Sequence, residues 1–348
     1  MATNRPSKDS MKSTWHTASR DTWTRYHWIL HLLGVDPHDS QKQAPVHSKS
    51  EKIPYFMQWS AHRFILFYAA LPLVLHQAYA FVTGRTLNPI ATFSLYFLSI
   101  NFNVIVEARV IARLGYIYGF LDGDKAPRDG IPDVGVTQVA QSLVKTTGSR
   151  LVLAIYLSYN RNQLPLDISW RWLLLETSLY GIILDFWFYW YHRTAHDVGF
   201  FWKYHRRHHL TKHPNSLLAA YSDHEQEVVE MVMIPLLTYS CLKLMGLPMS
   251  FYEWWICQQY VVFSEVIGHS GLRLHLTVPS PVSWLLEMGG AVLVVEDHDL
   301  HHRKGWRKSH NYGKQTRLWD AIFGTCHERI ESCSENVNYN DTASMPLW

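Results

Sequence analysis

Histidines in the second half of the chain recur at spacings that suit metal binding. Residues 192–196 read His-Arg-Thr-Ala-His, residues 205–209 read His-Arg-Arg-His-His, and residues 298–302 read His-Asp-Leu-His-His. In a helix, side chains three or four residues apart lie on one face, so each box can direct two or three imidazoles at one point. A single box arises by chance in many chains, but three of them together predict a metal site.

Two single histidines, His224 and His269, lie near the ends of apolar segments and complete the candidate set. Neutral imidazole suits iron, copper, nickel and zinc, whereas calcium and magnesium prefer oxygen ligands. Ten imidazoles exceed the four ligands of a structural zinc site and are about right for two ions with open positions. The predicted ligands are His192, His196, His205, His208, His209, His224, His269, His298, His301 and His302.

Two redox-active irons side by side could accept O2 and two electrons and generate an oxidant able to break an unactivated C–H bond. Soluble di-iron bundles do this with Glu-x-x-His pairs, a pattern that is absent from this sequence. Carboxylates that could orient the imidazole N–H groups are available at Asp185, Glu227, Glu265, Asp297 and Asp299.

Apolar segments must position these histidines. Five of them cover residues 64–83, 90–106, 172–191, 228–245 and 251–268, and each approaches the ~20 residues that cross a hydrocarbon core. Turn-like linkers at 84–89 and 246–250 join four of them into two hairpins. The shorter stretch 284–295 is expected to be re-entrant or interfacial. The predicted fold is all-α: a multi-span integral membrane helical bundle with a cytosolic, histidine-rich metal-binding cap.

The distribution of positive charge predicts the orientation of this bundle. Loop 246–250 carries no Lys or Arg, whereas residues 1–63, 192–227 and 269–348 carry nine, five and eight. The positive-inside tendency therefore places these three regions in the cytosol. A cytosolic N-terminus and a cytosolic His192 require an even number of crossings between them, but three apolar segments precede His192. Either the segment 143–159 supplies a fourth crossing or one of the three does not span.

Composition agrees with a membrane protein. Aromatic residues make up 14% of the chain, with 15 Trp and 19 Tyr, and such rings favour the membrane interface. The net charge of +3 is too small to argue for a nucleic-acid partner. The four cysteines show no CxxC spacing and predict no disulfide framework. We expect a polar N-terminal segment over 1–60, with no apolar signal peptide, one membrane domain over 61–335 and a tail over 336–348.

A different class of function is also open: a non-catalytic membrane zinc-binding protein or transporter with histidine-rich loops. Transporters place polar ligands near the middle of the membrane, whereas the boxes here follow the ends of apolar segments. A membrane zinc protease is excluded, because Val228 stands where the HExxH motif beginning at His224 requires histidine.

These residues resemble the sterol desaturase and fatty acid hydroxylase superfamily of membrane di-iron enzymes over roughly residues 170–326. The resemblance rests on the three histidine boxes, on His269-Ser-Gly, on Asn311-Tyr-Gly and on the stretch 318–325. The motifs are closest to sterol C4-methyl oxidase-like members, although Asp297 stands where a further histidine often precedes the last box.

The resemblance implies an endoplasmic-reticulum enzyme in which the ten predicted histidine ligands named above bind iron. It also implies O2 as co-substrate and electrons from NAD(P)H through cytochrome b5 or a reductase. The expected reaction is hydroxylation of a C–H bond in a lipid, sterol or terpenoid-like substrate, as a step of a specialised biosynthetic pathway. The alternative is a sterol or sphingolipid desaturase of housekeeping lipid metabolism.

Overall fold

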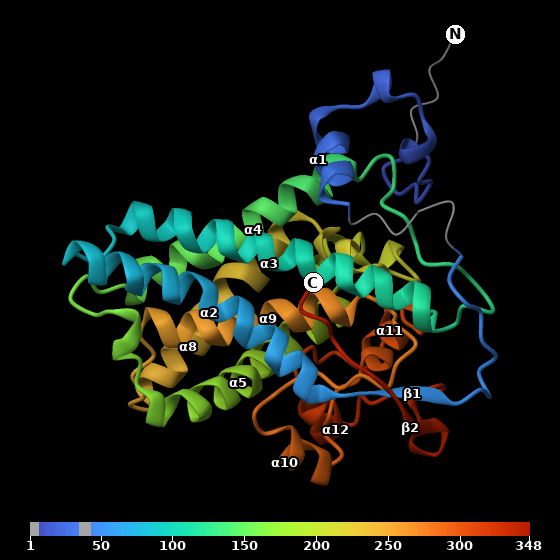
Figure 1. The fold of residues 1–348 in the computed structure, drawn as a ribbon. Helices are drawn as coiled ribbons and strands as arrows, with labels where there is room; N and C mark the ends of the chain where they lie inside the picture. Colours follow the sequence, from blue (N-terminus) through green and yellow to red (C-terminus); the bar gives the residue numbers. More distant parts are fainter. Residues whose placement is uncertain (1–6, 35–42) are drawn as a thin grey trace.

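The computed structural model describes residues 7–34 and 43–348, and within them the chain is mostly helical (Figure 1). This confirms the predicted dominance of helices. Six long segments form the body of the molecule. They are α2 (Gln58–Thr83), α3 (Pro89–Tyr118), α4 (Val136–Ser158), α5 (Trp170–Asp197), α8 (Ile234–Leu244) and α9 (Phe251–Gly268). The short helix α7 (His224–Val228) and the π turn η6 (Val229–Met233) lead directly into α8.

Consecutive long helices run in opposite directions, so that their ends gather in two layers. At one end, the Tyr159 hydroxyl that follows α4 donates to the carbonyl oxygen of Leu87, before α3, at 2.6 Å. At the other end, the Leu121 amide after α3 donates to the carbonyl oxygen of Gly271, just past α9, at 2.8 Å. Helix α4 brings the number of long helices up to His192 to four, and it covers most of the segment 143–159 that was expected to supply a further crossing.

The helices differ in how much apolar surface they leave exposed. Only α2 and α3, among the described helices, are long and apolar enough to cross a membrane by length and composition. Both carry large exposed apolar side chains, such as Phe81 and Leu98. In contrast, α9 lies in the centre of the bundle with every residue except Glu265 buried. A central helix of this kind needs no polar face, which is why its sequence is apolar on all sides apart from a few buried polar residues such as Glu253 and Gln259.

Shorter elements cover the end of the bundle where α5 and α9 finish. The helices are α1 (Arg25–Leu33), α6 (Gly199–His205), α10 (Ser283–Met288), α11 (Val295–Lys304) and α12 (Leu318–Phe323). The 3-10 turns at this end are η1 (Trp15–Thr17), η2 (Arg20–Thr22), η4 (His208–Leu210), η5 (Ser216–Ala220) and η7 (Ser334–Asn336), whereas η3 (Pro165–Asp167) lies at the opposite end, between α4 and α5. The stretch 284–295, expected to be interfacial, contains most of α10, and Trp284, Leu285 and Met288 are exposed there.

A two-stranded parallel sheet, which the all-α expectation did not include, joins the two ends of the chain. Strand β1 (Ile53–Phe56) pairs with β2 (Val337–Ala343), with a register shift between Pro54 and Tyr55. The residues after β2 then pack on α2, where the Tyr68 hydroxyl donates to the Leu347 carbonyl oxygen at 2.5 Å. The segment 336–348, expected as a tail, therefore contacts the bundle.

The packing of this C-terminal segment predicts a difference between two of its side chains. Met345 is fully buried, whereas Trp348 is 75% exposed. We expect Met345→Ala to lower the free energy of unfolding by about 2–4 kcal/mol, because it leaves a cavity between the segment and α2. Trp348→Ala, the matched control, should change it by less than about 0.5 kcal/mol. Denaturant unfolding in detergent measures both, and equal effects of the two variants would contradict this packing.

Candidate metal centre

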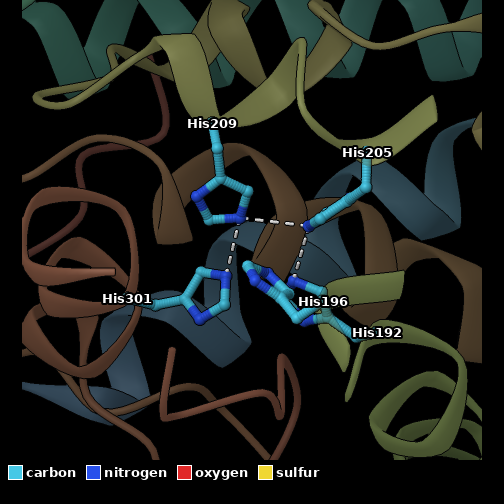
Figure 2. Close-up of side chains that lie close together, drawn as sticks. All are labelled: His192, His196, His205, His209 and His301. Atoms are coloured by element: carbon cyan, nitrogen blue, oxygen red, sulfur yellow. Dashed lines mark hydrogen bonds between the residues drawn. The ribbon is translucent and has the colours of Figure 1, made fainter. Parts of the chain in front are cut away.

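Five histidines converge at the end of α5. His192 and His196 come from α5, His205 ends α6, His209 lies in η4, and His301 lies on α11. One nitrogen from each ring lies within 4.8 Å of the corresponding nitrogen of every other ring, and all five side chains are buried. Figure 2 shows their rings turned toward a common centre. We call these five residues the first group.

The nitrogen spacings within the first group do not suit hydrogen bonding. The Nε2 of His205 lies 3.0 Å from the Nε2 of both His192 and His209, and the Nε2 of His209 lies 3.0 Å from that of His301. An imidazole nitrogen carries either one hydrogen or one lone pair, so a nitrogen with two such neighbours cannot hydrogen-bond to both. Adjacent ligands around an octahedral ion with metal–nitrogen bonds of ~2.1 Å stand ~3.0 Å apart. The spacing therefore fits nitrogens that share a cation.

A second group adjoins the first. It consists of His208 in η4, His269 at the end of α9, and His298 and His302 on α11, all buried and within 4.8 Å by the same measure. The Nε2 of His269 lies 3.3 Å from that of His208 and 3.0 Å from that of His298. The rings of His209 and His302, one from each group, stack with centroids 4.8 Å apart.

The two groups divide the histidine boxes in a regular way. Pairs four residues apart stay together: His205 and His209 belong to the first group, and His298 and His302 belong to the second. The remaining histidine of each box, His208 or His301, joins the opposite group. The expectation that each of these boxes aims at one point therefore needs correction. Consecutive residues of a helix point ~100° apart, so neighbours such as His301 and His302 face different centres.

Most of the ring Nδ1 atoms are held by acceptors that fix their hydrogens. Backbone carbonyl oxygens accept from His192 (Tyr312, 2.8 Å), His196 (Trp306, 2.7 Å), His269 (Glu265, 2.8 Å), His301 (His310, 2.6 Å) and His302 (Thr211, 3.0 Å). The Oε1 of Gln226 accepts from His205 at 3.1 Å. Each of these six rings is thereby left with a lone pair on Nε2, which is the atom that faces the centre of its group.

The structure does not bring His224 into either group. Its side chain is 54% exposed at the start of α7, and its Nδ1 lies 3.2 Å from an oxygen of Glu227. His213 also lies apart, with its Nε2 3.0 Å from Asp122. Thus nine of the ten histidines singled out in the sequence come together.

The carboxylates expected to orient the imidazoles have other partners. Asp299 forms ion pairs with Arg128 and Arg303, and Asp297 pairs with Arg329. Only Glu265 contacts a clustered histidine, and it does so through its backbone oxygen. The imidazoles are held mainly by carbonyl oxygens, which no side-chain pattern in the sequence could reveal.

Asp185 and Asp320 position the loop that carries several of these contacts. Asp185 accepts from the amides of Lys314, Gln315 and Thr316, and Asp320 accepts from those of Tyr312 and Gly313. The loop places the carbonyl oxygen of Tyr312 against His192. It also buries Lys314, whose Nζ lies 2.9 Å from Glu265. Nothing in the sequence singles out Lys314, because it lies in a polar stretch among other basic residues.

Burial keeps these imidazoles neutral. Desolvation, reinforced by repulsion from neighbouring rings, lowers the pKa of His208, His298 and His302 well below the ordinary value of 6.5. Neutral imidazole is the form that binds metal. The Nε2 atoms of His196 and His302 are buried and have no hydrogen-bond partner in the described chain, and such orphaned acceptors are costly unless a ligand satisfies them. The donor set therefore fits two neighbouring transition-metal ions.

These pKa values predict how the metal-free protein responds to acid. Burial lowers the pKa of His269 and of His310 from 6.5 to about 4. Between pH 4 and pH 6.5 the unfolded chain therefore binds more protons than the folded chain. The free energy of unfolding should therefore be greatest above pH 6.5 and fall as the pH drops toward 4. Denaturant unfolding of chelator-treated protein at several pH values measures this, and a free energy that stays constant or rises on acidification would contradict the buried, neutral state.

Comparisons with known proteins agree with this site. Residues 177–325 match the family model "Fatty acid hydroxylase". The chain is 45% identical over 307 residues to "Fatty acid hydroxylase vlmA" from a Lecanicillium species, covering 84% of each chain. It is 30% identical to human alkylglycerol monooxygenase, over 54% of this chain and 37% of that one. It is 29% identical to Arabidopsis thaliana methylsterol monooxygenase 2-2, over 52% and 64%. No solved structure matches the chain.

The matched region contains all nine clustered histidines and every residue that accepts from their Nδ1 atoms. Relatives named as hydroxylases and monooxygenases place the chain among the O2-dependent oxidoreductases. The chain belongs to the fatty acid hydroxylase family, within the sterol desaturase and fatty acid hydroxylase superfamily.

Proposed function

We propose that the protein is a membrane-bound, non-haem di-iron oxygenase that uses O2 and two electrons to hydroxylate a C–H bond of a lipid, sterol or terpenoid-like substrate. The observation that carries this proposal is the pair of adjoining, buried, all-histidine groups. We prefer hydroxylation to desaturation because two relatives, named for an alkylglycerol and for a methylsterol, are both called monooxygenases. We assign this activity to a domain over residues 61–335.

The proposed iron ligands are the nine clustered histidines. The first ion would be held by His192, His196, His205, His209 and His301, and the second by His208, His269, His298 and His302. His224, which the resemblance also implied, is left out because its exposed ring pairs with Glu227. Four or five ligands leave open positions on an octahedral ion, where O2 can bind.

When bound, the irons would supply O2 reduction and abstraction of the substrate hydrogen. The chain itself fixes the rings through their Nδ1 hydrogens and excludes bulk water by burying every clustered imidazole. Lys314, whose ammonium pairs with Glu265, lies close enough to both groups to interact electrostatically with His205 in the first and His208 in the second.

We further propose that α2, α3, α4 and α5 cross the membrane before His192, which makes both the N-terminal segment and the histidine groups cytosolic. The antiparallel course of these helices and the exposed apolar surface of α2 and α3 support this arrangement. The proposed membrane is the endoplasmic reticulum.

The proposed electron source is NAD(P)H, through cytochrome b5 or a reductase that binds the cytosolic face. Two arginines in the second box, Arg206 and Arg207, carry the type of charge that attracts an acidic donor. In the structure, however, Arg206 pairs with Asp9 and Arg207 with Asp223, so much of this charge is already neutralised. Docking through these residues would have to compete with the N-terminal segment.

The ligand assignment predicts different results for two neighbouring histidine variants. His208→Ala removes a ligand of the second group and should abolish turnover while lowering bound iron from two ions per chain toward one. His224→Ala should retain two irons and at least about half of the activity, because its ring lies outside both groups. Metal analysis and O2 uptake on purified, iron-loaded protein measure both quantities.

The same pair of variants tests the alternatives. Full activity and iron content in His208→Ala would overturn the site. Loss of one iron in His224→Ala would restore the ten-ligand set. A wild-type protein that binds zinc after expression in iron-rich, zinc-poor medium, and consumes no O2, would point instead to the non-catalytic zinc protein.

The proposed topology predicts which loops a membrane-impermeant thiol reagent can reach. In a cysteine-free background, Lys308→Cys lies in an exposed loop on the histidine side, and Asn162→Cys lies in the exposed loop between α4 and α5. In sealed microsomes, reagent added outside should label Lys308→Cys at once and Asn162→Cys only after permeabilisation. Labelling of both before permeabilisation would show that the loop between α4 and α5 lies on the same side as the histidine groups, so that these two helices do not complete their crossings.

A further inference from the structure

A mostly apolar cavity runs between the helices beside the second histidine group. Its enclosed volume is about 80 Å³, and the space rises to about 630 Å³ when the open solvent at its mouth is included. It lies between α3, α4, η5, η6 and α9. Val104, Leu143, Leu217 and Val262 contribute apolar wall. Its surface also includes Glu265, whose backbone oxygen holds His269 and whose carboxylate holds Lys314. The cavity therefore extends from the helix bundle to the edge of the proposed metal centre.

One charged side chain in this wall has no carboxylate partner in the described chain, and its terminal nitrogens are not among the buried atoms that lack a hydrogen bond. Arg150 lines the cavity and is only 5% exposed. Its guanidinium makes one hydrogen bond with the described chain, from Nε to the sulfur of Met231 at 2.8 Å, and sulfur is a weak acceptor. Among residues 7–34 and 43–348, no carboxylate oxygen lies within ion-pair distance of it. Its two terminal nitrogens thus have no acceptor in this part of the chain.

A buried arginine without a carboxylate partner is unusual at the depth in the bundle where Arg150 lies. It lies 14 residues after the first residue of α4, Val136, which is about 21 Å along a helix axis. In a helix that crosses the membrane, a charge at this depth is expensive and is usually retained for a functional partner. Glu230 and Glu265 interact with it electrostatically from a distance, which offsets its charge without occupying its hydrogen-bond donors.

A second polar atom in the same wall is also unsatisfied. The hydroxyl oxygen of Ser216 is buried and has no hydrogen-bond partner in the described segments, and Ser216 lines the cavity. On the opposite side, Met231 belongs to the π turn η6, an irregularity that occurs frequently at functional sites. The terminal nitrogens of Arg150 and the hydroxyl of Ser216 are therefore available to a ligand in the cavity.

We propose that this cavity binds the apolar substrate of the oxygenase and that Arg150 is its specificity-determining residue, donating hydrogen bonds to a carbonyl-type oxygen of that substrate. The proposal rests on the proposed function. Arginine presents a planar fork of donors that suits a carboxylate or an ester oxygen. Anchoring this oxygen at Arg150 would hold the apolar remainder along the cavity, with its reacting carbon toward Glu265 and the histidines.

Binding of four probes with the same chain length tests this. Iron-loaded, full-length protein in lipid nanodiscs is titrated with tetradecanoic acid, methyl tetradecanoate, tetradecan-1-ol and tetradecane, with empty nanodiscs subtracted. Wild type should bind the acid or the ester at least about tenfold more tightly than tetradecane, as expected for hydrogen bonds to a charged donor. Acid above ester identifies a carboxylate as the preferred group, and equal affinities identify a carbonyl oxygen.

Arg150→Met should abolish this preference while leaving the affinity for tetradecane within about twofold and the iron content unchanged. Arg150→Lys keeps a charge but loses the fork, so it should reduce the preference at least about threefold. Arg113→Met, an exposed arginine on α3, is the matched control and should retain it. Thermal unfolding checks that each variant is folded.

A folded Arg150→Met that still prefers the acid or ester would overturn the proposal. If that variant does not fold, an unchanged preference in Arg150→Lys overturns it instead. Wild type that contains two irons and consumes O2, yet shows no preference among the four probes, would overturn the role of Arg150 alone. Wild type without iron or O2 uptake would overturn the oxygenase proposal.

Discussion

Nine neutral imidazoles buried against one another are the constraint on which the rest of the structure depends. Buried polar nitrogens are costly unless they are satisfied, and rings whose Nε2 atoms all face inward cannot satisfy each other. The six Nδ1 hydrogens with protein acceptors show that the fold has already committed these rings to one orientation. Cations at the two centres, as proposed, would stabilise this costly arrangement, because metal binding contributes directly to folding free energy.

The architecture follows from the need to deliver these rings to one layer. The first group draws on α5, α6, η4 and α11, and the second on η4, α9 and α11. Antiparallel helices achieve this because α5 and α9 both end at the same face of the bundle. The loop held by Asp185 and Asp320 then closes the layer and supplies both a carbonyl oxygen for His192 and the ammonium of Lys314.

The sequence could predict the components of the site but not their division. Spacing identified the boxes, and apolar length identified the helices that carry them. His208 and His209 part within the 3-10 turn η4, and His301 and His302 part because consecutive residues of α11 point ~100° apart. Neither division follows from the spacing of a box alone. His224 looked equivalent to His269 because both lie near the end of an apolar block. Only the packing of α7 shows that the ring of His224 faces outward.

Arg150 illustrates the other kind of information that the sequence lacks. One arginine among apolar residues of α4 reads simply as a weak point in a predicted crossing. Only the fold shows that α3, η5 and α9 enclose Arg150 beside a cavity and provide no acceptor for its terminal nitrogens. The same packing places the only incompletely buried residue of α9, Glu265, between that cavity and the histidines.

X-ray absorption at the iron edge of the purified protein, combined with metal counting, tests the central claim most directly. The account predicts two irons per chain, each surrounded mainly by nitrogen at ~2.1 Å, with the outer-shell scattering typical of imidazole. One iron per chain, or a shell dominated by sulfur or by carboxylate oxygen, would contradict it.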